Sequence, residues 1–72
     1  MAITLDDLAH WFTYHAPTEP QIKSYQVIRD AGLEFAAAVL DHTPPSADQT
    51  AAIRKIREAV MTANAAIACG GR

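Results

Sequence analysis

Residues 46–69 read SADQTAAIRKIREAVMTANAAIAC, the most regular apolar pattern in the chain. The larger apolar residues recur at alternating steps of three and four, which is typical of a helix that packs along one seam. These seam residues are Ile53, Ile56, Val60, Ala63 and Ile67. Alanines stand beside the seam at seven-residue intervals, at Ala52, Ala59 and Ala66. Their small side chains would let another backbone approach closely.

Start and stop signals bound this helix and the one before it. Ser46 and Gln49 have capping-box spacing, and Gly70 is a stop signal, so we expect the last helix over about 46–69. The preceding stretch HTPP, residues 42–45, is a turn because two successive prolines end a helix. A second helix is expected over about 19–41, with Pro20 in its first turn and a second capping box from Thr18 and Gln21. A turn this short makes the two helices an antiparallel hairpin.

The first residues predict a short additional helix over about 4–11, opened by Thr4 and Asp7. The run His15-Ala16-Pro17 ends it, since a residue before proline avoids helical geometry. The fold class is therefore all-α, a single helical-hairpin domain spanning residues 1–72. Gly32 falls inside the second helix, where it is either tolerated or admits a close neighbour.

The small size of the chain favours self-association. A chain of 72 residues buries little of its surface, and its one cysteine, Cys69, cannot form an internal disulfide. A hairpin also has only two layers. Its remaining apolar surface needs a third layer, most simply another copy of the chain; that surface comprises Trp11, Phe12, Phe35, Met61 and the alanine stripe. We therefore expect a homo-oligomer.

Charge and composition exclude several partners. The net charge is −2 with only six basic residues, which argues against DNA or RNA polymers. No apolar run approaches the roughly 20 residues that span a bilayer, so a membrane is not expected as a partner. The N-terminus does not resemble a secretory signal, and the cytoplasm is the expected location.

Ring-bearing side chains cluster in WFTYHAP, residues 11–17. One interpretation is an apolar plug at the end of the hairpin, which suits Trp11 and Phe12. The other is a platform on which a base stacks, for which Tyr14 is the best candidate. Arg29 is either a solvated helix residue or a planar fork that binds phosphate oxygens.

Arg57 and Asn64 are weaker candidates on the last helix. Asn64 lies in the apolar run AVMTANAAIA, where an unbonded amide costs free energy. It either fixes register at an oligomer interface, which we favour, or hydrogen-bonds a ligand.

No metal site, cofactor or catalytic apparatus is expected. His10 and His15 are five residues apart rather than four, with a helix break between them, and His42 lies in the turn. No glycine-rich loop follows a strand and no nucleophile elbow is present, so the protein is not expected to be an enzyme.

Two motifs together resemble a known family. WFTYHAP-x-x-x-Q over residues 11–21 and REAVMxANAAIA over residues 57–68 are similar to the phage-encoded hairpin family of the anti-CBASS cyclic-nucleotide sponge, whose hairpin domain is shared with an anti-Thoeris sponge. The resemblance covers roughly residues 10–68. It implies a homohexamer of helical hairpins in the host cytoplasm that binds cyclic dinucleotides such as 3′,3′-cGAMP, and in some members cyclic trinucleotides. Such a sponge does not cleave its ligand but withholds it, so that CBASS immunity is not triggered.

The resemblance also implies site residues. Tyr14 matches the aromatic residue that stacks on a base, with Phe12 and His15 beside it. Arg29 stands where the sponge has a basic side chain near phosphate. Arg57 and Asn64 match a possible trinucleotide site or the interface that builds it.

A second function stays open on the residues alone. The alanine-rich seam and the Trp11–Phe12 pair would also suit an oligomeric helical module that binds another protein and no nucleotide. A small DNA-binding regulator is disfavoured by the low number of basic residues.

Overall fold

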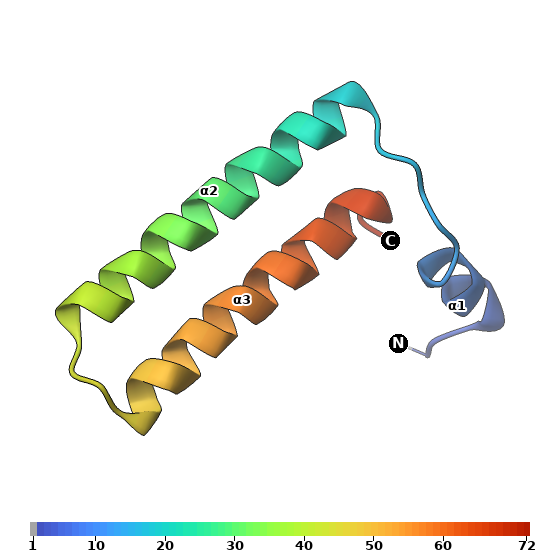
Figure 1. Cartoon of the computed structure of the whole chain (residues 1–72). Helices are drawn as coiled ribbons and strands as arrows, with labels where there is room; N and C mark the ends of the chain where they lie inside the picture. Colours follow the sequence, from blue (N-terminus) through green and yellow to red (C-terminus); the bar gives the residue numbers. More distant parts are fainter. Residues whose placement is uncertain (1) are drawn as a thin grey trace.

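A computed structural model describes residues 2–72 of the chain. Within that range it contains three helices and no strand: α1 (Leu5–Trp11), α2 (Glu19–His42) and α3 (Ala47–Ala68). Helices α2 and α3 lie side by side as an antiparallel hairpin, and α1 lies beyond its open end, where α2 begins and α3 ends (Figure 1). The predicted all-α hairpin with a short N-terminal helix is confirmed.

Reciprocal capping boxes open the first two helices. Thr4 accepts a hydrogen bond from the backbone N–H of Asp7, whose carboxylate accepts one from the N–H of Thr4. Thr18 and Gln21 repeat the arrangement at α2. A capping residue keeps an extended backbone, so α1 begins one residue later than expected. The hydrogen bonds from Thr4 lower the pKa of the Asp7 carboxyl group. The stabilisation from this capping box is therefore fully present at pH values above the ordinary pKa range of carboxyl groups, and it is lost as the pH falls through the lowered pKa of Asp7.

The third cap differs from the predicted capping box. Ser46 accepts a hydrogen bond from the N–H of Gln49, and α3 begins one residue later than expected. The Gln49 side chain does not return the bond. It donates instead to the carbonyls of Leu40 and Thr43, at 3.3 and 3.0 Å. Gln49 thus closes the turn between the two long helices, because the last carbonyls of α2 have no partner within their own helix.

Two glycines close α3 in the arrangement that the stop signal predicts. Gly70 and Gly71 have φ angles of 66° and 79°, a region that L side chains rarely adopt. The N–H of Gly70 donates to the carbonyl of Ile67, and the N–H of Gly71 donates to that of Ala66. This is a Schellman motif, which satisfies carbonyls that the helix leaves unpaired.

The hairpin buries little of itself. Ile56, at 9% exposure, is the only buried side chain among residues 2–72. The accessible surface is 5811 Å², whereas a compact monomer of this mass exposes about 4,400 Å². The radius of gyration is 15.3 Å, against about 11 Å for a compact chain of this length. One copy is therefore an elongated two-helix layer without an enclosed core.

Several large apolar side chains lie at the surface of the hairpin. Ile22 and Phe35 are 47% and 61% exposed, because they flank the line of contact between α2 and α3. Phe12 is 86% exposed and does not plug the hairpin end, whereas Trp11, at 40%, lines a hollow against the end of α3. Within residues 2–72 no helix has the length and apolar character that a bilayer-crossing segment needs.

Gly32 lies at a close approach of the two long helices. A Cβ built on Gly32 would lie 2.5 Å from Cγ2 of Val60, far inside van der Waals contact. The structure thus selects between the two readings of this residue: its missing side chain admits a neighbour. Valine is stiff about χ1, so Val60 has little room to move away.

We predict that Gly32→Ala lowers the melting temperature, although alanine is intrinsically better in a helix by about 1 kcal/mol. The reason is the clash with Val60, since overpacking typically costs about 1–3 kcal/mol. Thermal unfolding followed by circular dichroism at fixed protein concentration measures the change. Val60→Ala in the same chain removes the clashing methyl groups and should recover part of the loss; an additive double mutant would contradict the clash.

We also predict that Thr18→Ala destabilises the fold by about 1 kcal/mol, because it removes the side chain that caps α2. Thr50→Ala is the matched control, since Thr50 is exposed within α3 and caps no helix. Denaturant unfolding of both variants would show the difference. Equal losses would indicate that the cap does not contribute.

Candidate functional site

An open hollow lies where the connector between α1 and α2 passes the start of α2. Its volume is about 400 Å³. The connector contributes Tyr14, His15 and Pro17, and α2 contributes Ile22, Tyr25, Gln26 and Arg29. The α2 residues recur at steps of three, one and three, which places them on one face of the helix. The structure thus brings Tyr14, His15 and Arg29 together, three of the residues singled out from the sequence.

Two of these side chains are free to meet a ligand. Tyr14 is 83% exposed, and Arg29 is also exposed, so both stand at the rim of the hollow. A phenol ring can stack on a nucleobase, and a guanidinium can bind two phosphate oxygens at once. Because its rim is open, the hollow in one chain would enclose only part of a ligand.

His15 forms the inner side of the hollow. Its ring is half-buried, and its Nε2 lies 2.7 Å from the carbonyl oxygen of His10, to which it donates. The two imidazole rings lie 4.6 Å apart and are tilted by 50°. This contact fixes the connector next to Tyr14 and ties it to the end of α1.

Tyr25 also lines the hollow, although it was not singled out from the sequence. It is half-buried and lies four residues before Arg29 on the same face of α2. The signal available in the sequence was that spacing, which places an aromatic ring beside the guanidinium. Gln26 is held in place by its hydrogen bond to Oδ1 of Asp30, at 2.8 Å.

Phe12 lies apart from this hollow. It is the C-cap residue of α1, is highly exposed, and is not among the residues that line the hollow. It was singled out because it is two residues from Tyr14, but the chain turns between them. Among residues 2–72, Phe12 lines neither of the two hollows described here that Arg29 borders.

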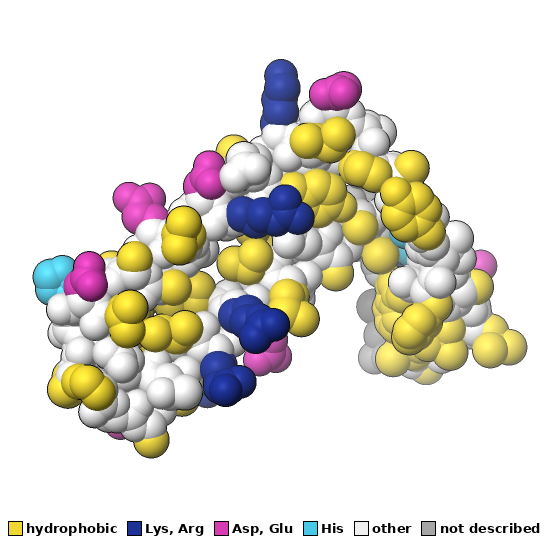
Figure 2. All heavy atoms as spheres, viewed as in Figure 1, with side chains coloured by type: hydrophobic (Ala, Val, Ile, Leu, Met, Phe, Trp, Pro, Cys, Tyr) yellow, Lys and Arg dark blue, Asp and Glu magenta, His cyan; other side chains and the backbone are white. Residues whose placement is uncertain are grey.

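A second hollow, of about 270 Å³, runs along one side of the hairpin seam. Arg29 and Leu33 from α2 and Arg57 and Met61 from α3 line it. Arg29 therefore borders both hollows, and Lys and Arg side chains stand over both arms of the hairpin on the face drawn in Figure 2. Arg57 thus shares a surface with Arg29, although it lies on another helix.

Asn64 lines neither of these two hollows. It is half-buried in α3, and its side-chain oxygen is buried without a hydrogen-bond partner among the described residues. An acceptor left in this state costs about 1–3 kcal/mol. A donor from outside the single chain would relieve that cost.

A third hollow, of about 520 Å³, lies on the other side of the seam and is almost wholly apolar. Ile28, Phe35 and Val39 from α2 face Ala52 and Ala59 from α3 across it. It shares its floor with the second hollow, since Gly32, Ile56 and Val60 line both. The third hollow is therefore the more apolar side of the layer, with Lys55 as its charged lining residue, whereas Arg29 and Arg57 border the second.

The chain matches a known family over most of its length. The family model described as Acb2/Tad1, hairpin domain, matches residues 5–68, from the first residue of α1 to the last of α3. No curated protein and no solved structure matches the chain. The resemblance carried by the motifs at residues 11–21 and 57–68 is confirmed. The chain belongs to the Acb2/Tad1 hairpin domain family.

Proposed function

We propose that this protein is a phage anti-defence sponge that binds cyclic oligonucleotide second messengers and sequesters them without cleavage. The ligands are cyclic dinucleotides such as 3′,3′-cGAMP, with cyclic trinucleotides as a further class. The observation that carries the proposal is the convergence of Tyr14 and Arg29 on one open hollow. Membership of the Acb2/Tad1 hairpin domain family supports it.

The chemistry of the hollow suits half of a cyclic dinucleotide. Such a ligand has two bases and two phosphates in a ring of approximate two-fold symmetry. One copy of the hollow offers one exposed phenol ring and one guanidinium. Two copies related by a two-fold axis would stack both bases and bind both phosphates. The net charge of −2 does not oppose this, since the cations act locally.

Such a shared pocket requires a homo-oligomer, and we propose a hexamer. The support is the poor burial within one chain and the apolar hollow beside the seam, lined by residues such as Phe35 and Ala59. Covering that side with another copy would supply the third layer that a hairpin lacks. Small residues at the alanine stripe allow the backbones to approach closely.

Arg57 and Asn64 are the proposed residues for a trinucleotide site or for the interface that builds it. Arg57 borders the same hollow as Arg29, and the unpaired oxygen of Asn64 would accept a donor from another copy or a ligand. These residues lie on α3, away from Tyr14. The two ligand classes would therefore use different contact residues on α3 and the connector, although Arg29 borders the hollow of Arg57 as well as that of Tyr14.

Sequestration sets a requirement on affinity. A sponge acts by stoichiometry in the host cytoplasm, so the free messenger must fall below the level that triggers its effector. This requires a dissociation constant near 1 nM or below, about −12 kcal/mol. Repetition of the same ring and guanidinium through symmetry supplies more contacts than one hollow can.

We predict that the purified protein binds 3′,3′-cGAMP with nanomolar affinity and releases it unchanged. Native mass spectrometry with a panel of cyclic di- and trinucleotides would report subunit number and ligand stoichiometry together. Chromatography after heat denaturation would then recover intact ligand. A well-folded monomer, or no mass shift and no calorimetric heat with any member of the panel, would contradict the proposal.

We predict that Tyr14→Ala weakens cyclic-dinucleotide binding at least about fivefold, since stacking contributes about 1–3 kcal/mol per base. Tyr14→Phe keeps the ring and should bind much more tightly than Tyr14→Ala. Phe12→Ala removes an equally exposed ring that lies outside the hollow, and it should leave affinity nearly unchanged. Isothermal titration calorimetry measures all three variants, and equal losses at Tyr14 and Phe12 would exclude this hollow.

We predict that Arg29→Ala weakens binding more than tenfold, because a charge-assisted hydrogen bond contributes about 1.5–3 kcal/mol. Arg29→Lys keeps the charge but not the planar fork, so its affinity should be intermediate. Lys23→Ala is the matched control, because Lys23 is an exposed cation of α2 that does not line the hollow. A loss of the same size in Lys23→Ala would indicate general electrostatics rather than a site.

The alternative function is an oligomeric helical module that binds a protein and no nucleotide. The apolar hollow along α2 and α3 is the observation in its favour. The same mass spectra distinguish it, since such a module would assemble normally but show no nucleotide adduct.

A further inference from the structure

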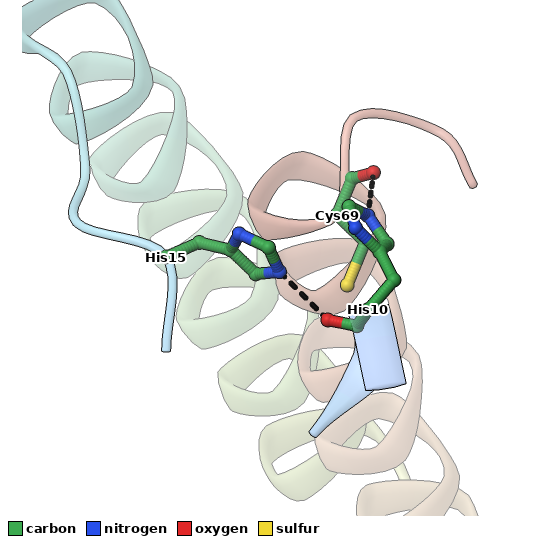
Figure 3. A group of neighbouring side chains, drawn as sticks. All are labelled: His10, His15 and Cys69. Carbon is green, nitrogen blue, oxygen red and sulfur yellow. Dashed lines mark hydrogen bonds between the residues drawn. The ribbon is translucent and has the colours of Figure 1, made fainter. Parts of the chain in front are cut away.

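Three side chains that can bind a metal ion converge at the open end of the hairpin. They are His10 at the end of α1, His15 in the connector and Cys69 at the C-cap of α3. One ring nitrogen from each histidine and the Cys69 Sγ all lie within 4.8 Å of one another (Figure 3). We propose that these residues form a binding site for a borderline-soft divalent metal ion, of which Zn²⁺ is the type.

The ligand set suits such an ion chemically. Zn²⁺ takes imidazole nitrogen and thiolate sulfur as ligands, and three protein ligands commonly leave the fourth position to water. Harder cations such as Mg²⁺ and Ca²⁺ prefer oxygen ligands. A site of two imidazoles and one thiol therefore favours Zn²⁺-like ions over Mg²⁺ and Ca²⁺.

The geometry is close to what coordination requires. With Zn–N and Zn–S distances of about 2.0 and 2.3 Å, two nitrogens and one sulfur in tetrahedral positions lie about 3.3–3.5 Å apart. The three ligand atoms, which lie within 4.8 Å of one another, therefore need to approach by up to about 1.5 Å. All three residues are half-buried, so an ion would lose only part of its water and remain accessible from solution.

Backbone carbonyls orient both rings. His10 Nε2 lies 2.8 Å from the carbonyl oxygen of Cys69, and His15 Nε2 lies 2.7 Å from that of His10. Carbonyls only accept, so each Nε2 carries the hydrogen and each ring keeps its lone pair on Nδ1. Donation from a ring N–H to a carbonyl is the usual support of a metal-binding histidine.

His10 satisfies that pattern directly, since its Nδ1 is left for the ion. For His15 the nitrogen that carries the hydrogen bond is the one facing His10 in Figure 3. Binding through that nitrogen would exchange one hydrogen bond to a carbonyl for a metal bond. The free energy of zinc coordination by a complete site exceeds that of one hydrogen bond several-fold.

The spacing of His10, His15 and Cys69 along the chain does not indicate that they form a cluster. The expectation of no metal site was based on the five-residue spacing of His10 and His15, the helix break between them and the place of His42 in the turn. The break after α1 turns the chain back, so that the two rings lie 4.6 Å apart. The antiparallel return of α3 then brings in Cys69, 59 residues from His10.

A metal ion here would link α1 to the hairpin. Without it, the polar contacts between them among residues 2–72 are those of His10 with Cys69, of the Trp11 indole N–H with the Arg72 carbonyl, and of Arg72 with Asp6 and Asp7. Most of these groups are exposed, and exposed ion pairs contribute little. Small chains commonly gain stability from such a staple.

The test is a spectroscopic titration of the reduced, chelator-treated full chain with Co²⁺, in the absence of any nucleotide. We expect one ion per chain, with a thiolate-to-cobalt absorption band that Zn²⁺ abolishes and Mg²⁺ does not. Zn²⁺ should also raise the melting temperature. Failure of nucleotide binding would leave these readouts untouched, so the two proposals fail separately.

Three variants complete the test. Cys69→Ser should remove the thiolate band, and His15→Gln should weaken Co²⁺ binding at least about tenfold, each with unchanged helical circular dichroism. His42→Ala is the matched control, because His42 lies at the other end of α2. The proposal is overturned if the wild-type chain gives no thiolate band, if Cys69→Ser retains it, or if His42→Ala loses it.

Discussion

Two helices packed along one seam form a layer that cannot enclose its own apolar side chains, and the rest of this structure follows from that constraint. Only Ile56, at the centre of the seam, is buried within residues 2–72. Gly32 lets the backbones approach there, and the caps of α2 and α3 fix where each helix begins. A layer this thin presents both of its sides to partners, and in this chain the two sides differ in chemistry.

Because of that difference in chemistry, one side of the layer suits assembly with another copy and the other side suits binding of an anionic ligand. One side of the seam carries Ile28, Phe35 and Ala59 around an apolar hollow, while the other carries Arg29 and Arg57. Burying the apolar side against another copy would leave the arginines free to meet an anion. The mild negative charge of the whole chain is compatible with that role, because a small ligand responds to a few placed cations rather than to net charge.

Local signals predicted most of the fold and only part of the candidate site. Capping pairs such as Thr18 with Gln21 act within one helical turn, so spacing alone located the helices to within a residue. Tyr14 and Arg29 were identified by their chemistry, and the structure places them at one hollow. Phe12 was included for its place beside Tyr14 in the sequence and does not line this hollow of the single chain. Tyr25 does line it but was not singled out, because spacing cannot distinguish a groove wall from a core.

What spacing could not predict are contacts made across the open end of the hairpin. Gln21 donates to the carbonyl of Ile67, and His10 donates to that of Cys69, so the end of α3 is held by residues from two earlier segments. These contacts depend on how far α3 extends and on the direction in which the connector leaves α1, and neither is a local property. His15 belongs to both the nucleotide hollow and the histidine–cysteine cluster. Whatever fixes this residue therefore also fixes the adjacent Tyr14, so the connector, although it has no regular secondary structure, is the segment on which both proposed sites depend.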